Sequence, residues 1–361
     1  MERVEPIKIA LLSCNHGHAR AYYGLIHDPR FKVCCFSVAK GYKDRIFIDR
    51  LINIPCYDDD EKMLDEHPEV EAVVMASANY LHPMQFKLCL ERNIHIMSMK
   101  VPTLDLQAYD EILKLKQKSK SIVLVELEMH YHAETERLKE LIHGGKIGNV
   151  KTFIATNTSH NPMWWLPWHG IPEESYGKRV PIKPGSNIFR GGALTDHPHI
   201  FDMMRYILND EVSEVYAETA PNMRKAEVED FAFVTGVTKK GTLFSLDPSY
   251  SRTENPAKVI SDGWEQYPKR VEVNMSAYGD KGYVIGDVYG NWIHHTGLPN
   301  HNYTSFPCGH RYGKHNMIDN FYNAIRFGEE PALTLEYHRK TIEIVDAAYR
   351  SIYEGKPIKL N

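Results

Sequence analysis

Five short apolar runs alternate with helical patterns over the first 126 residues, and this alternation constrains the fold more than any other feature. The runs are Ile7–Leu12, Phe31–Val38, Glu71–Ser77, Ile94–Met99 and Ile122–Glu126. Continuous apolar runs of this length are typical of strands buried on both faces, as in parallel sheets. Helical patterns such as Tyr22–Ile26 and Leu106–Gln117 separate them, so the series predicts a doubly wound α/β domain over residues 1–126.

From Val150 onward the sequence changes to β-type runs joined by short turns. The runs are Val150–Thr156, Val212–Thr219, Phe231–Val237, Thr242–Leu246, Val271–Tyr278 and Gly282–Asp287. Turns such as Lys239–Gly241 are typical of antiparallel sheets. We therefore expect a second, α+β domain over residues 127–361, whose last helices, His315–Phe327 and Tyr337–Glu354, can pack back on the first domain.

Bulk properties fit a soluble protein of about two domains. The chain has 361 residues, 43% hydrophobic and 25% charged. A net charge of -4 argues against nucleic acid as a partner, and no apolar run approaches membrane-spanning length. The six cysteines show no spacing typical of metal ligands and fit a reducing compartment, so we expect a cytoplasmic location and no membrane partner.

The loop after the first run lies in the context that dinucleotide binding requires, because a strand, a tight turn and a helix follow one another. The glycine pattern is altered: Ser13 and Asn15 stand where glycines are expected, and only Gly17 remains. Ser77 and Lys100 follow two further runs, and the carboxyl ends of parallel strands are where ligands collect.

The second run ends at Ser37 and Val38 without the acidic residue that holds the ribose hydroxyls of NAD. Lys40, Lys43 and Arg45 follow, which would suit the 2′-phosphate of NADP or would simply be the solvated start of a helix. We expect NADP to bind at least as well as NAD.

The segment Gly191–Asp202 combines two glycines, an aspartate and two histidines ahead of an apolar helical run. Asp196 stands where a helix N-cap belongs, with Pro198 in the first turn. On spacing alone, Asp196 is a cap and His199 a core histidine; the alternative is an acid–base pair that faces a pocket. A tryptophan-rich loop that includes Trp165 precedes this segment and suits either a sugar ring or an oligomer contact.

The order of these parts resembles the glucose-fructose oxidoreductase, inositol dehydrogenase and rhizopine-catabolism (Gfo/Idh/MocA) family over nearly the whole chain. The matching segments are Ile7–Ala19, Ala76–His82, His95–Lys100, Gly144–Val150, Gly191–Asp202 and Ala347–Pro357. The resemblance implies a Rossmann domain that binds NAD or NADP and a second domain built on an open, mostly antiparallel sheet with helices on one face. It also implies oxidation or reduction of hydroxyl groups of sugars, inositols or related polyols, and homodimers or homotetramers joined through the sheet.

Residue by residue, the resemblance makes Lys100, Asp196 and His199 catalytic. His199 would be the general base, Lys100 would polarise the substrate oxygen, and Asp196 would orient substrate or His199. The implied cofactor-binding residues are Ser13, Asn15, His16, Gly17, His18, Ser37, Lys40, Ser77, Asn79, His82 and Lys100. The implied substrate-binding residues are Lys100, Trp165, Arg190, Asp196, His197 and His199.

Two departures from the family pattern leave alternatives open. Met99 replaces the usual glutamate before Lys100, and Val101 separates that lysine from Pro102. The spacing from Asp196 to His199 is one residue short, so His197 is the alternative base. Other readings are a glycosidase that retains NAD, with Glu128, His130 or His160 as an extra acid or base, and a non-catalytic regulator. A metal on Asp196, His197 and His199 ranks last, and we expect none.

Overall fold

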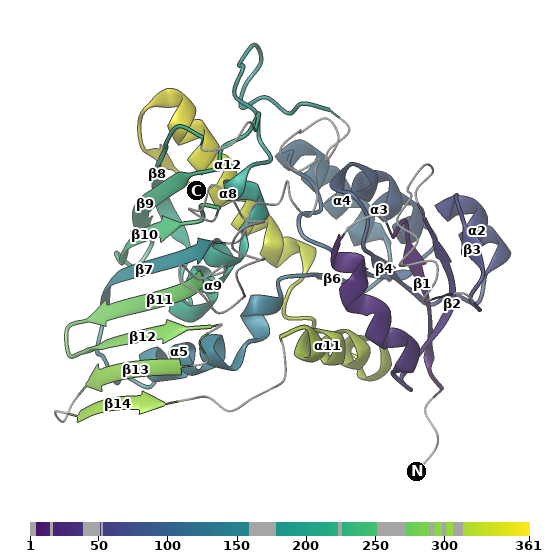
Figure 1. Cartoon of the computed structure of the whole chain (residues 1–361), viewed down its shortest axis with the longest axis horizontal. Coiled ribbons are helices and arrows are strands. Elements are labelled where there is room, and N and C mark those ends of the chain that lie inside the picture. Colours follow the sequence, from purple (N-terminus) through teal and green to yellow (C-terminus); the bar gives the residue numbers. More distant parts are fainter. Residues whose placement is uncertain are drawn as a thin grey trace, which may run out of the picture. The chain divides into compact units, whose positions relative to one another are not determined.

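The structure is a computed structural model that describes residues 5–14, 17–38, 51, 53–158, 178–222, 226–250, 272–288, 290, 292–297, 301–305 and 313–361. The chain forms two compact units (Figure 1). The first contains Met1–Glu126 together with Ile318–Arg339, and the second contains most of the remainder. Residues 318–339 therefore belong to the first unit, although they follow the second sheet in sequence.

The first unit is built on a parallel sheet of six strands, β1 to β6. They are Ile7–Leu12, Phe31–Ser37, Cys56–Tyr57, Ala72–Met75, His95–Ser98 and Val123–Val125. Their spatial order is β3-β2-β1-β4-β5-β6, and every pair is parallel. The chain builds outward from β1 in one direction and then returns to β4 and builds in the other. This reversal makes a topological switch point at β1 and β4, and it confirms the doubly wound fold.

Helical segments connect these strands. In the described part of the unit they are the 3₁₀ helices η1 (Gly17–His27) and η2 (Asn79–Leu81) and the α-helices α2 (Asp60–Glu66), α3 (His82–Glu91) and α4 (Leu106–Lys118). Asp59 caps α2 by accepting a hydrogen bond from the N–H of Lys62, and Asp105 caps α4 in the same way. Helix α2 therefore begins at Asp60, directly after its cap.

The late segment of the first unit is fastened by polar contacts. Arg326 in α11 (Gly313–Phe327) pairs with Glu71 at 2.8 Å. At the start of α12 (Leu335–Glu354), the Tyr109 hydroxyl donates to the carbonyl of Leu335 at 3.0 Å, and Arg339 pairs with Asp110.

The second unit is built on a nine-stranded sheet, β7 to β15. The strands are Val150–Thr158, Val212–Thr219, Ala232–Thr238, Leu243–Asp247, Glu272–Gly279, Tyr283–Asp287, Trp292–Gly297, His301–Ser305 and Ile358–Lys359. Their order is β14-β13-β12-β11-β7-β10-β9-β8-β15. All pairs are antiparallel except β7 with β10. The open, mostly antiparallel sheet is confirmed; β13, β14 and β15 were not expected.

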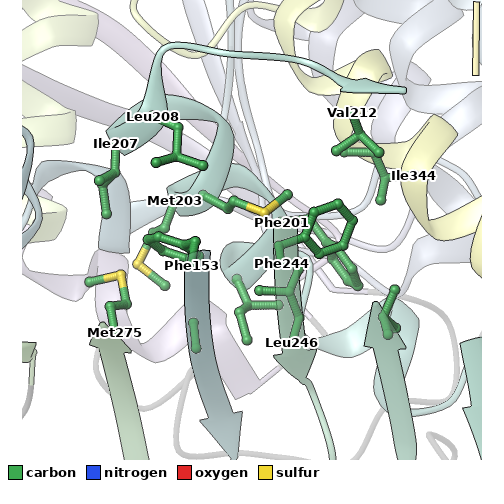
Figure 2. Close-up of a cluster of buried hydrophobic side chains, with 14 of the residues drawn as sticks. Phe153, Phe201, Met203, Ile207, Leu208, Val212, Phe244, Leu246, Met275 and Ile344 are labelled. Atoms are coloured by element: carbon green, nitrogen blue, oxygen red, sulfur yellow. The ribbon is translucent and has the colours of Figure 1, made fainter. Parts of the chain in front are cut away.

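Helices α5 (Ala133–His143), α9 (His199–Leu208) and part of α12 pack on one face of this sheet (Figure 1). Figure 2 shows Phe201 and Met203 of α9 meeting Phe153, Phe244 and Met275 from three strands. These side chains are at most 3% exposed, and burial of each contributes about 1.5–3 kcal/mol. The helix that carries His199 is therefore anchored in the core.

The opposite face of this sheet exposes apolar side chains at alternate positions. Ile154 lies between the buried Phe153 and Ala155, so it points away from α9. Ile154, Phe233, Leu243 and Tyr278 are 43%, 50%, 59% and 38% exposed. We call these four residues the open-face patch.

None of the helices in the described parts of the chain has the length and apolar character needed to cross a membrane.

Candidate functional site

The carboxyl edge of the first sheet carries the expected dinucleotide loop. Strand β1 ends at Leu12, Ser13 adopts a positive φ of 41°, and helix η1 begins at Gly17. Asn15 and His16 lie outside the described residues, and so does the side chain of His18. A strand, a short turn and a helix N-terminus at the switch point fit the pyrophosphate of a dinucleotide.

The side chains of Ser13 and Ser37 turn inward at this edge and meet Asp60. The Ser13 hydroxyl donates to Oδ2 of Asp60 at 2.9 Å, and the Ser37 hydroxyl donates to Oδ1. The backbone N–H of Ser13 donates to Oγ of Ser37 at 2.7 Å. Both serine hydroxyls are therefore hydrogen-bonded to Asp60, a residue that the sequence patterns did not single out.

Two more side chains extend this network. Gln85 of α3 donates from Nε2 to Oδ2 of Asp60 at 2.6 Å, and its Oε1 accepts from the hydroxyl of Ser77 at 2.6 Å. Ser77 and Gln85 are fully buried, and Asp60 is 8% exposed. The predicted cofactor residues Ser13, Ser37 and Ser77 thus share one buried network beneath the loop.

Lys100 follows β5, and the main chain beside it is held by two side chains from the segment that follows β4. Asn79 donates from Nδ2 to the carbonyl of Val101 at 2.8 Å, and Nδ1 of His82 donates to the same oxygen at 3.0 Å. Burial lowers the pKa of His82 to about 4, so the ring is neutral near pH 7. Asn79 and His82, expected beside the cofactor, are therefore bound to the segment that carries Lys100.

The segment that carries Asp196 and His199 folds as two helices. Short helix α8 spans Ala193–Asp196 with Gly192 as its N-cap, and Pro198 is the N-cap of α9. Asp196 therefore ends α8, and its interpretation as the N-cap of the following helix is wrong. The cause is a break at His197, whose backbone leaves the helical region (φ -111°, ψ 51°).

Glu229 and Tyr349 hold this segment in place. Oε1 of Glu229 accepts hydrogen bonds from the Tyr349 hydroxyl at 2.7 Å and from the N–H of Leu194 at 3.0 Å. Burial raises the pKa of Glu229 to about 7, against the lowering effect of these donors. A Cβ on Gly192 would lie 2.5 Å from the backbone oxygen of Glu229, so this close approach requires glycine.

Arg190 belongs to the same support. Its Nη1 pairs with Asp346 of α12 at 2.7 Å, its Nη2 donates to the carbonyl of Ile182, and the side chain is 10% exposed. The structure thus gives a structural partner to an arginine predicted to bind substrate.

His199 begins α9 and faces a carboxylate. Its Nε2 lies 3.9 Å from Oε2 of Glu128, and the two side chains are 5% and 16% exposed. Glu128 lies in η3 (Glu128–Tyr131), a 3₁₀ turn that packs on α9. The polar–apolar alternation of Glu126–His132 is typical of an extended strand, but the chain coils into this turn instead.

A second histidine–carboxylate pair also joins η3 to α9. Nδ1 of His130 is 3.3 Å from Oδ2 of Asp202, and both side chains are buried. The His130 ring lies 3.6 Å from the Tyr206 ring, measured between centroids. Asp202 was not recognised from the sequence, because a buried aspartate in an apolar run resembles helix patterning.

His197 is fixed by its own contacts. Its Nδ1 lies 2.5 Å from the carbonyl oxygen of Pro248, and its ring packs edge-on against Tyr250. A carbonyl only accepts, so Nδ1 carries the hydrogen and Nε2 is the basic nitrogen of the neutral ring.

The remaining predictions concern three side chains, a metal site and the distribution of the catalytic candidates over the two units. Trp165, Lys40 and His160 lie outside the described residues. Among the described side chains, no three His, Cys, Asp or Glu residues are grouped so as to hold a metal ion. Lys100 belongs to the first unit, whereas Asp196, His197 and His199 belong to the second.

Fold and site together define the class of dinucleotide-binding oxidoreductases. Residues 17–127 match the oxidoreductase family with an NAD-binding Rossmann fold (GFO_IDH_MocA), and residues 135–285 match the GFO/IDH/MocA C-terminal domain. The chain belongs to the Gfo/Idh/MocA family.

Relatives extend over almost the entire chain. Myo-inositol 2-dehydrogenase of Thermotoga maritima is 26% identical over 93% of this chain and 95% of its own length. An inositol dehydrogenase homologue of Azotobacter vinelandii, solved with NAD⁺, has a TM-score of 0.81 at 14% identity, covering 99% of this chain and 98% of its own. The WlbA dehydrogenase of Bordetella pertussis, solved with NADH and UDP-GlcNAcA, has a TM-score of 0.78 at 19% identity and covers 99% of both chains. These likenesses confirm the fold.

Proposed function

We propose that this protein is an NAD(P)-dependent dehydrogenase that acts on a hydroxyl group of a sugar, an inositol or a related polyol. The observation that carries the proposal is the buried imidazole of His199 beside the carboxylate of Glu128. A histidine next to a carboxylate is suited to proton transfer near neutral pH. The relationship to myo-inositol 2-dehydrogenase supports the substrate class.

Each catalytic residue has a chemical role in this proposal. NAD(P), when bound, exchanges a hydride with the carbon that bears the hydroxyl group. His199 accepts the hydroxyl proton during oxidation and returns it during reduction, while Glu128 stabilises the imidazolium. The Lys100 ammonium donates a hydrogen bond to the reacting oxygen, and Asp196 orients the substrate. His197 is the alternative base, since its Nε2 is the basic nitrogen.

For the cofactor, we propose that the segment from Ser13 to His18 receives the pyrophosphate through its backbone. The inward-facing Ser13 side chain supports this choice, because it leaves the main chain as the contact surface. For the substrate, Trp165 and Lys100 complete the proposed contacts.

We also propose a cytoplasmic homodimer or homotetramer that joins through the open-face patch. The patch exposes four apolar side chains on one face of the second sheet, a pattern that marks interaction sites. Cys14, Cys34, Cys35, Cys56 and Cys89 are free thiols, which fits a reducing compartment.

The test is nicotinamide absorbance of the purified protein with NAD or NADP and a panel of inositols and sugars. We expect absorbance of the reduced cofactor to rise with at least one polyol. Bound cofactor without net turnover on any polyol would overturn the dehydrogenase, and absence of dinucleotide binding would overturn the redox role altogether.

A further inference from the structure

A buried carboxylate lies at the carboxyl edge of β1 and β2. Asp60 stands in the first turn of α2, yet its side chain reaches Ser37, the last residue of β2, and Ser13, which follows β1. The three groups that donate to it are two hydroxyls and one amide, all uncharged. In the described part of the chain, no cation pairs with Asp60, so its negative charge is not neutralised there.

This position coincides with a gap in the sequence pattern. NAD-binding units place an acidic residue at the end of the second strand, where it holds the ribose hydroxyls and disfavours a 2′-phosphate. Here that strand ends in Ser37, whose hydroxyl donates to Asp60. Asp60 therefore brings a negative charge to the edge from which the acid is missing.

We propose that Asp60 determines dinucleotide preference in this chain by excluding the 2′-phosphate, so that NAD(H) is preferred over NADP(H). The inference rests on the proposed function and reverses the expectation drawn from Ser37 and Lys40. Asp60 acts through charge and through the two serines, and it is a specificity-determining residue rather than a catalytic one.

The thiol of Cys14 lies close enough to Asp60 to be affected by its negative charge. Cys14 is the second residue of the dinucleotide loop, and its backbone N–H donates to the carbonyl of Ser37 at 2.9 Å. Burial raises the pKa of the Cys14 thiol, and the negative charge of Asp60 raises it further. The charge of Asp60 therefore acts on a residue of the dinucleotide loop.

The test is direct binding of NADH and NADPH, measured by nicotinamide fluorescence or calorimetry on the full-length protein. We expect the wild type to bind NADH at least tenfold more tightly than NADPH. Asp60→Asn removes the charge while keeping the shape, and we expect it to reduce the ratio of the two affinities at least fivefold. Asp60→Glu keeps the charge, and we expect it to preserve the preference.

Asp59→Asn is the matched control. Asp59 is the exposed N-cap of the same helix, and asparagine caps a helix as well as aspartate. We expect its ratio to equal that of the wild type. A less ordered loop would lower the affinity for NADH and for NADPH alike. Only a change in the ratio of the two affinities therefore reports on the charge of Asp60.

Three outcomes decide the matter. Equal affinity of the wild type for NADH and NADPH overturns the inference alone, and so does an unchanged ratio in Asp60→Asn. Binding of neither dinucleotide overturns the proposed function and the inference with it. If circular dichroism shows that Asp60→Asn is unfolded, Asp60→Thr replaces it as the neutral variant, and the wild-type ratio already decides whether the preference exists.

Discussion

The hydroxyl of Tyr349 donates a 2.7 Å hydrogen bond to Oε1 of Glu229, the oxygen that also accepts from the N–H of Leu194. The same hydroxyl accepts from the N–H of Gly191 at 3.1 Å. Helix α12 is thereby connected to both ends of the turn that opens α8. The position of the segment leading to His199 depends on a carboxyl group whose own charge changes near neutral pH.

Stability is expected to fall as pH rises from about 4.5 to about 7 because of Glu229. Burial raises its pKa to about 7, so between these values the folded state holds more protons than the unfolded state. The full shift is worth up to about 3 kcal/mol, which is lost above pH 7. Thermal denaturation at pH 5 and pH 8 measures this effect. Between these two pH values, Glu229→Gln should lose less stability than the wild type.

The control for this prediction is Glu227→Gln. Glu227 lies two residues away and pairs with Arg179 at 2.8 Å near the surface. Its variant should retain the wild-type pH dependence. An identical loss of stability in Glu229→Gln and the wild type would contradict the role of Glu229.

His199→Ala is expected to abolish turnover while dinucleotide affinity is retained. Removal of a general base typically reduces the rate about 10²–10⁴-fold. Steady-state kinetics and cofactor titration measure the two properties separately. The control is His143→Gln, because His143 lies at the end of α5 in the same unit and donates from Nε2 to the carbonyl of Ile207. If His199→Ala keeps near-normal turnover and His197→Ala loses turnover, the general base is His197 instead.

Glu128→Gln is expected to lower kcat roughly tenfold or more, with a smaller effect on KM, because it removes the charge that faces Nε2 of His199. Glu128→Asp keeps the charge but shortens the side chain, so recovery of kcat in this variant would assign the effect to charge rather than to packing. Glu140→Gln removes an exposed glutamate that pairs with Arg137 on α5 and should leave kcat unchanged. A kcat for Glu128→Gln equal to that of the wild type would remove Glu128 from the mechanism.

Disruption of the open-face patch is expected to reduce the mass of the assembly. The double variant Ile154→Asp/Leu243→Asp places two charges on adjacent strands β7 and β10. Light scattering after size-exclusion chromatography measures the mass directly. Met84→Asp, on α3 of the first unit and 59% exposed, is the control. A wild-type protein that is already monomeric would refute assembly through this face.

The strands and helices were predictable where hydrophobic periodicity is strong. Apolar runs identified β1, β2, β4, β5 and β6 because most residues of these strands are buried. The two-residue strands β3 and β15 were missed, since two residues carry no periodicity. Likewise, η3 has four residues, too few to distinguish a 3₁₀ turn from alternation.

The candidate site was predictable only where residues are close in sequence. His199 stands out in its own segment, whereas its partner Glu128 comes from a turn some seventy positions earlier. The Asp60 network joins Ser13, Ser37, Ser77 and Gln85 from separate places in the chain, and each member alone is an ordinary polar residue. Burial of these groups together is a property of the folded chain, and no local pattern reports it.

The hydrogen bonds of Asn79 and His82 end on a main-chain oxygen, that of Val101. Every amino acid supplies such an oxygen, so these anchors place no demand on the side chain at position 101. Replacement of the proline that usually follows the lysine therefore leaves the anchoring contacts intact.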